Sequence, residues 1–233
     1  MNAHANVLHR SGRLTYLERE EVASRTGFIP KENGWNPEEF ARQQIRGLVR
    51  QVFFGNDSAG MKQVVFTAVE ANTDVAGICE RVGKALALET RAHVAIVRRE
   101  HQSAGRKNVR FSLDPRIKSR SKQLSGNVWR VPGFGLCEGT EGVGTAHYWL
   151  SCLADLRNEF EYAVIQAPAA GVSSEAAMLG QLADGVILVL EAHTTRKAAA
   201  RKIKESLGAQ SRILGIVLTE RRFPVPERIY RRL

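Results

Sequence analysis

The sequence predicts an α/β fold of the doubly wound type, in which a mostly parallel sheet carries helices on both faces. Several short segments are continuous apolar runs, such as VVFTAV (64–69) and GVILVL (185–190), and strands buried on both faces have this character. These runs alternate along the chain with segments of helical periodicity. A parallel sheet with crossover helices accounts for that alternation.

The first predicted element is a helix over residues 36–55. Asn36 can cap its N-terminus, Pro37 suits its first turn, and apolar residues between Phe40 and Val52 recur at steps of three and four. Strands and helices then alternate along the rest of the chain. The predicted strands are 62–69, 93–98, 127–133, 162–168, 184–192 and 212–220, and the predicted helices are 74–89, 147–160, 173–183 and 194–208.

The domain organisation follows from the same pattern. Residues 1–35 are polar and aperiodic, so we expect an extended or partly disordered N-terminal arm. Residues 36–233 are expected to form a single domain with a basic loop at 98–126. A chain of 233 residues with 43% hydrophobic content is long enough to bury one core.

The chain is basic, with a formal net charge of +10 from 34 Lys and Arg against 24 Asp and Glu. Two stretches hold much of the excess, 98–123 and 220–233, and basic surfaces attract polyanions of any kind. Neither stretch matches a DNA or RNA recognition module, and stacking aromatics do not interleave with the charges. We therefore do not expect a nucleic-acid partner, while a solvated loop and tail or a polyanion-binding surface both remain open.

Cysteine and histidine spacing indicates no metal site. The three cysteines, Cys79, Cys137 and Cys152, are odd in number and widely separated, so neither a disulfide framework nor a zinc site is expected. No apolar stretch reaches the length of a membrane span or resembles a signal peptide core. These features predict a cytoplasmic location.

The order and spacing of the segments resemble the cytoplasmic ATPase domain of bacterial exopolysaccharide and capsule biosynthesis proteins. This family includes the bacterial tyrosine kinases and is related to the partition and septum-site ATPases. The resemblance covers roughly residues 36–233. The segments that carry it are VVFTAVEANTDVAGICERVGKALA (64–87), HVAIVRRE (93–100), FEYAVIQAPA (160–169), LADGVILVLEAHTTRKAAARKI (182–203) and RILGIVLTERRFPVPERIYRRL (212–233).

The resemblance implies a P-loop NTPase-like fold with a phosphate loop of the type PGEGKT, a second strand ending in VDAD and a third reading YDYVIIDTPP. With Thr67 and Glu70 as anchors, this chain departs from the pattern at every position that would hold the nucleotide. The substitutions are Asn72 and Asp74 at the loop glycines, Val75 at the phosphate lysine, Ala76 at the magnesium-binding Ser/Thr, Arg98 at the first strand-end Asp and Gln166 at the second.

These substitutions predict that the nucleotide site has degenerated. Side chains on former glycines obstruct a backbone anion site, and Asp74 repels triphosphate. Val75 offers no charge to phosphate, and the neutral Gln166 holds magnesium poorly. We therefore expect no catalytic residue, no cofactor and no metal, and we hypothesise that Arg98 pairs with Asp74 or Glu70 inside the empty site.

The resemblance also suggests where partners bind. In the kinases an ExxRxxR helix drives ring formation, and of the corresponding positions only Arg46 is kept, with Arg50 beside it. In the tail FPVPERIYRRL (223–233), Phe223 and Tyr230 are candidate anchors on the domain or on a partner. The implied partners are a polysaccharide co-polymerase or an active ATPase paralogue, with a homo-oligomer also possible. Membrane contact is expected only through such a partner, peripherally at the inner membrane.

The function expected from these observations is a catalytically inactive ATPase-like scaffold or regulator in exopolysaccharide or capsule biosynthesis. One alternative is a divergent ATPase or tyrosine kinase that still binds ATP and Mg²⁺ with a lysine recruited from elsewhere, for example Lys62 or a partner subunit. A second alternative is a polyanion-binding module that uses the basic stretch 98–123.

Overall fold

The computed structural model describes residues 6–8, 37–55, 60–98, 117–132 and 144–220, and in these an eight-stranded sheet has the order β1-β8-β7-β2-β6-β3-β5-β4. The strands from β8 to β5 run parallel, whereas β1 and β4 pair antiparallel with the two outer members. The strands are β1 Asn6–Leu8, β2 Gln63–Ala68, β3 Val94–Arg98, β4 Lys122–Ser125, β5 Val128–Pro132, β6 Tyr162–Gln166, β7 Gly185–Glu191 and β8 Ile213–Thr219.

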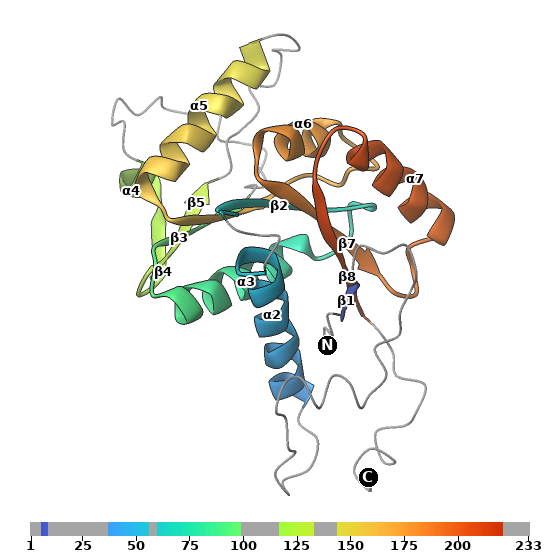
Figure 1. Ribbon diagram of the computed structural model, residues 1–233, viewed down its shortest axis with the longest axis horizontal. Coiled ribbons are helices and arrows are strands. Elements are labelled where there is room, and N and C mark those ends of the chain that lie inside the picture. The colour runs from blue at the N-terminus through green and yellow to red at the C-terminus, as the bar shows by residue number, and fades with distance from the viewer. Residues whose placement is uncertain (1–5, 9–36, 56–59, 99–116, 133–143, 221–233) are drawn as a thin grey trace, which may run out of the picture.

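The helices cover both faces of this sheet, so the doubly wound α/β class is confirmed (Figure 1). Helices α2 and α3 lie on one face, and α5, α6 and α7 lie on the other. The short α4 precedes the edge strand β4. The helices are α2 Pro37–Phe53, α3 Val75–Thr90, α4 Ile117–Arg120, α5 Gly144–Glu159, α6 Glu175–Leu182 and α7 Lys197–Gly208.

Two apolar cores, one on each face, follow from the alternation of side chains along each strand. In β2, Val64 and Phe66 pack in the core beneath α2 and α3, whereas Val65 belongs to the core beneath α5, α6 and α7. Every residue of β2 is buried. Central strands of a parallel sheet are covered on both faces, which explains the apolar run on both faces of β2. Its two polar residues, Gln63 and Thr67, are buried as well and hydrogen-bond to the Leu153 and Pro168 carbonyls.

The structure adds short elements that the apolar pattern does not predict. Residues 6–8, within the predicted arm, form β1 at the edge of the sheet beside β8, and the predicted basic loop contains α4 and β4. These pieces span three or four residues each, too few for a hydrophobic period to be visible. Their pairing with the sheet decides their conformation. Residues 99–116 of the basic loop lie outside the described residues.

The packing of α5 gives a matched test of the second core. Leu156 is fully buried under this helix, while Leu150 on the same helix is 50% exposed. We expect Leu156→Ala to lower the free energy of unfolding by about 2–5 kcal/mol, because it removes buried methyl groups and leaves a cavity. Leu150→Ala should change it by less than about 1 kcal/mol. Urea unfolding followed by circular dichroism measures both, and equal effects would contradict this assignment of the core.

Candidate functional site

The candidate site lies at the carboxyl ends of β2, β6 and β3, which are neighbours in the sheet. Ligands of open parallel sheets bind at such an edge. Phe66 pairs with Gln166 and Val97 pairs with Ile165, so Arg98 and Gln166 stand at the same level on adjacent strands. Because Ile96 and Val164 pack toward α3, the alternation of side chains directs Arg98 and Gln166 to the α3 face as well. The structure thus brings the two predicted strand-end residues together.

Helix α3 begins at this edge, and the Asp74 carboxylate caps it. The Gly77 backbone N–H donates a hydrogen bond of 2.8 Å to Asp74 Oδ1. A Cβ atom on residue 77 would overlap the same carboxylate, so glycine is what lets Asp74 fold over the first turn. The free N–H groups and partial positive charge of a helix N-terminus attract anions. In this chain a side chain already provides that negative charge.

The other predicted loop residues do not face a ligand with charge or hydrogen-bonding groups. Val75 is 5% exposed and belongs to the core beneath α3, Ala76 is half-buried and Asn72 is exposed. The position of the phosphate lysine is therefore filled by a side chain that stabilises the core. The structure also contradicts Lys62 as the substitute for the phosphate lysine. Lys62 directly precedes the first residue of β2, so it lies at the opposite edge of the sheet from the candidate site. At about 3.3 Å per strand residue, it lies roughly 20 Å from the end of that strand.

The predicted ion pair of Arg98 with Asp74 or Glu70 is wrong. Within the described residues, Arg98 takes part in no ion pair. The physical reason is that the Asp74 carboxylate is held by the start of α3. Arg98 remains close enough to act on Cys79: burial first and the Asp74 charge second raise the pKa of the Cys79 thiol well above its ordinary value, and the Arg98 charge opposes the shift. Cys79 is thus an unreactive core thiol.

Several buried oxygens at this edge lack a hydrogen-bond partner in the described part of the chain. They are Glu70 Oε2, Thr73 Oγ1 and Gln166 Oε1. Thr73 is only 7% exposed. A carboxylate oxygen and an amide oxygen only accept hydrogen bonds. The Glu70 and Gln166 oxygens therefore suit a hydrogen-bond donor or a hydrated cation, whereas the Thr73 hydroxyl can also donate.

The segment after β6 runs along the end of β2. Thr67 Oγ1 donates to the Pro168 carbonyl at 2.6 Å, and the Ala170 N–H donates to the Ala68 carbonyl at 2.7 Å. Both bonds tie the two strand ends together beyond the last paired residues of the sheet. This part of the edge is consequently held by the backbone of the protein itself.

Asp184 is a residue whose role the sequence pattern does not reveal. It follows α6 and joins the amino-terminal end of β2 to α5: Asp184 Oδ2 accepts from the N–H groups of Lys62 at 2.8 Å and Gln63 at 2.7 Å, and Oδ1 accepts from Arg157 Nη2 at 2.6 Å. The resemblance of LADGVILVLEA (182–192) to the family thus has a structural explanation that requires no chemistry. An aspartate directly before a glycine at a strand start is the signal that could have suggested it.

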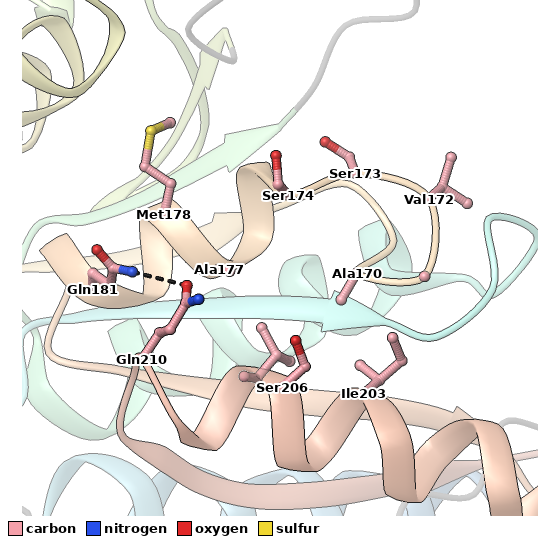
Figure 2. Close-up of a pocket in the computed structure, with 12 residues that line it drawn as sticks. Ala170, Val172, Ser173, Ser174, Ala177, Met178, Gln181, Ile203, Ser206 and Gln210 are labelled. Carbon is pink, nitrogen blue, oxygen red and sulfur yellow. Dashed lines mark hydrogen bonds between the residues drawn. The ribbon is translucent and has the colours of Figure 1, made fainter. Parts of the chain in front are cut away.

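A groove of about 560 Å³ lies between α6 and α7, beside the loop that follows β6. Figure 2 shows Ile203 and Ser206 projecting from α7 toward α6. The Gln181 side chain donates to that of Gln210 at 2.9 Å and links the two helices at one end of the groove. Sequence reasoning singled out none of these residues, because hydroxyl, amide and small apolar side chains form no motif.

The sequence predicts partner contacts at Arg46 and Arg50 on α2 and at Phe223 and Tyr230 in the tail. Arg50 forms an ion pair with Glu89 of α3 at 3.2 Å, so its guanidinium is engaged within the same chain. Arg46 is exposed on α2, and its role in assembly stays a prediction. Phe223 and Tyr230 lie outside the described residues.

In the described part of the chain, no three His, Cys, Asp or Glu side chains are grouped so as to hold a metal ion. Its helices are also too short or too polar to cross a membrane.

Comparison with solved structures identifies the fold. The chain is similar to the kinase domain of the Escherichia coli tyrosine kinase ETK, with a TM-score of 0.60, 13% identity and coverage of 85% of this chain and 84% of that one. It is similar to the chimeric protein CapA2B2, with a TM-score of 0.59, 17% identity and coverage of 85% and 97%. The tyrosine kinase domain of BceF gives a TM-score of 0.57, 13% identity and coverage of 85% and 86%.

No family model and no curated protein matches the sequence. At identities of 13–17% the structural likeness shows the fold alone. The P-loop NTPase-like architecture implied by the sequence resemblance is thereby confirmed, and bacterial tyrosine kinase domains are among its structural neighbours.

The cap on α3 is tested by removing its carboxylate. We expect Asp74→Ala to lower the free energy of unfolding by about 0.5–2 kcal/mol, because the Gly77 N–H loses its partner. Asn72→Ala, at an exposed neighbouring position, is the matched control and should change it by less than about 0.5 kcal/mol. Chemical denaturation measures both variants, and equal stabilities would show that Asp74 does not stabilise the helix.

The Asp184 cluster gives a second stability test. We expect Asp184→Ala to lower the free energy of unfolding by about 1–3 kcal/mol, since it leaves the part-buried Gln63 N–H without a partner and exchanges the bond to the exposed Lys62 N–H for water. Arg157→Ala removes only a partly exposed ion pair and should cost no more than about 1 kcal/mol. Thermal and urea unfolding of the two variants give the comparison. If Arg157→Ala were as damaging as Asp184→Ala, the backbone bonds would not be the main contribution.

Proposed function

We propose that this chain is a catalytically inactive ATPase-like protein that acts as a scaffold or regulator in exopolysaccharide or capsule biosynthesis. The observation that carries the proposal is the Asp74 carboxylate on the N-terminus of α3. In the resembling ATPases this helix start receives phosphate. A fixed negative charge in the same place opposes a triphosphate and already satisfies the helix.

The remaining residues at the edge support the same conclusion about ATP and Mg²⁺. The lysine position is the core residue Val75, and the strand-end positions are the neutral Gln166 and the cationic Arg98. Phosphoryl transfer requires cationic groups on the phosphate oxygens and carboxylates that position magnesium. Val75 and Gln166 lack the charges that these two roles require at their positions, and we derive no catalytic step from the described residues.

Two observations together support a scaffold role: the chain has the fold of the resembling ATPases, but the residues at its candidate site differ from theirs. The fold is that of the tyrosine kinase domains of ETK and BceF and of the chimeric protein CapA2B2, while Asp74 and Val75 at the start of α3 make internal contacts. The proposed partners are a polysaccharide co-polymerase or an active ATPase paralogue, and assembly into a homo-oligomer belongs to the same proposal. The proposed location is the cytoplasm, at the inner membrane through such a partner.

A second candidate is a divergent ATPase or tyrosine kinase that still binds ATP with Mg²⁺. The unpartnered oxygens of Glu70, Thr73 and Gln166 favour it, because hard cations bind oxygen ligands. Its lysine would come from a partner subunit, since Lys62 lies at the opposite edge. Polyanion binding through 98–123 stays a prediction.

Calorimetric titration of the purified protein with ATP and ADP, with and without Mg²⁺, separates the first two candidates. We expect no saturable heat up to about 1 mM nucleotide, which corresponds to a binding free energy weaker than about −4 kcal/mol. Micromolar binding that requires Mg²⁺ would contradict the inactive assignment and favour the divergent enzyme. Loss of that binding in Gln166→Ala would place the nucleotide at this edge, whereas Lys62→Ala, at the opposite edge, is the control expected to leave it unchanged.

A further inference from the structure

The α6–α7 groove presents apolar groups to solvent. Val172 at its rim is 74% exposed, and Met178 and Ile203 are half-buried on opposite walls. Leu207, 2% exposed, closes the base of the α7 wall. Concave surfaces with apolar walls are typical of sites that bind other molecules, and methionine adapts to differently shaped ligands. The groove therefore has the apolar component of a docking surface.

Polar groups without partners line the same groove. Ser174 stands at the N-cap of α6, yet its side chain makes no capping hydrogen bond, and within the described residues the exposed Ser206 hydroxyl has no partner either. The Gln181–Gln210 bond uses one donor and one acceptor, which leaves the Gln210 amide N–H₂ and the Gln181 oxygen with further capacity. Hydroxyl and amide groups of this kind can pair with the backbone of an extended peptide.

The charge around the groove favours an acidic occupant. The segment 196–205 of α7 and its N-cap carries five basic residues against one acidic residue. Arg201 pairs with Glu205 at 3.4 Å, whereas Arg196, Lys197, Lys202 and Lys204 form no ion pair with any described residue. Lys202 lies one helical turn before Ser206 and thus on the same side of α7 as the groove. At the Ser174 end, the partial positive charge of the α6 N-terminus is offset by Glu175 in its first turn, so the positive charge of the rim comes from α7.

The shape of the surface distinguishes a peptide from other anions. A flat lipid surface would contact the exposed cations of α7 but would leave the hollow between the helices unfilled. A nucleic acid strand is held by aromatic side chains that stack on its bases, and no aromatic residue lines the groove. An extended peptide uses the apolar walls, the amide and hydroxyl groups, and the positive rim together.

We propose that the α6–α7 groove binds an extended segment of a partner protein that carries both acidic and apolar residues. The inference rests on the proposed scaffold function and names the surface through which it acts. The apolar side chains of the segment lie against Met178, Ile203 and Leu207. Its carboxylates face Lys202, and its backbone pairs with the amides and hydroxyls of the walls.

A displayed library of random twelve-residue peptides, selected on the purified full chain, tests this proposal. We expect the enriched peptides to combine Asp or Glu with apolar residues, and their affinities are then measured by fluorescence anisotropy. Ser206→Trp fills the groove from an exposed position and should weaken binding at least tenfold. Lys202→Glu reverses the charge of the rim and should weaken binding about fivefold, more at low salt than at high salt. Arg46→Glu makes the same charge change on α2, on the opposite face of the sheet, and should leave binding unchanged.

Circular dichroism and thermal unfolding of each variant confirm that it is folded before binding is compared. Three results would overturn the proposal: a library that yields no enriched peptide, enriched peptides that bind Ser206→Trp as well as the parent, or peptides without acidic residues. Binding of phosphatidylglycerol vesicles or duplex DNA that Lys202→Glu abolishes, with no peptide selected, would assign the surface to those polyanions and would also overturn it. The nucleotide titration does not depend on these peptide-binding measurements. Nucleotide binding would contradict the proposed function, whereas a groove that binds no peptide would contradict only this inference.

Discussion

The hydrogen bond from the Gly77 N–H to the Asp74 carboxylate determines the character of the edge where ligands of this fold bind. Every helix starts with unsatisfied N–H groups and a partial positive charge, and these attract either a side chain or an external anion. In this chain the anion belongs to residue 74, and the missing side chain of Gly77 gives it room. The Gly77 N–H in the first turn of α3 therefore has a partner within the chain.

Both edges of the sheet combine hydrogen-bonded polar groups with buried oxygens that lack a partner. At the amino-terminal edge Asp184 accepts from two backbone N–H groups and an arginine. Buried oxygens that lack partners in the described residues occur on Gln63 at this same edge and on Thr73 and Gln166 at the carboxyl edge. A buried polar group without a partner costs free energy. Buried oxygens without partners thus occur at both edges, while hydrogen bonds to Asp184 hold the start of β2 and the Asp74 cap holds the start of α3.

The face of the sheet that is covered by α5, α6 and α7 carries a second candidate binding surface. The α6–α7 groove combines unpaired hydroxyl and amide groups with the positive charge of α7, and it lies beside the loop that follows β6. Because that loop is tied to the end of β2 through Thr67 and Ala170, the groove is connected by hydrogen bonds to the candidate edge. A fold can carry different binding surfaces at different places, so the groove and the edge are separate candidates for recognition.

The sequence by itself determined the α/β class, the order of the long elements and the absence of a lysine at the start of α3. Apolar runs such as 64–69 and 185–190 permit only buried strands in this context, and the residue type at position 75 is independent of the fold. The tertiary structure alone decided which polar groups find partners. Arg98 was expected to pair with Asp74, but the carboxylate is held by a backbone N–H three residues away.

The groove and the Asp184 cluster also required the tertiary structure, because their residues are far apart in the sequence and of types that occur everywhere on protein surfaces. Gln181 and Gln210 are separated by 29 positions, and Asp184 and Lys62 by 122. The short edge strands β1 and β4 are a third example, since three or four residues carry no hydrophobic period and become strands by pairing with β8 and β5. Local sequence thus determines what each segment can become, and long-range contacts determine which of its polar groups remain available to a partner.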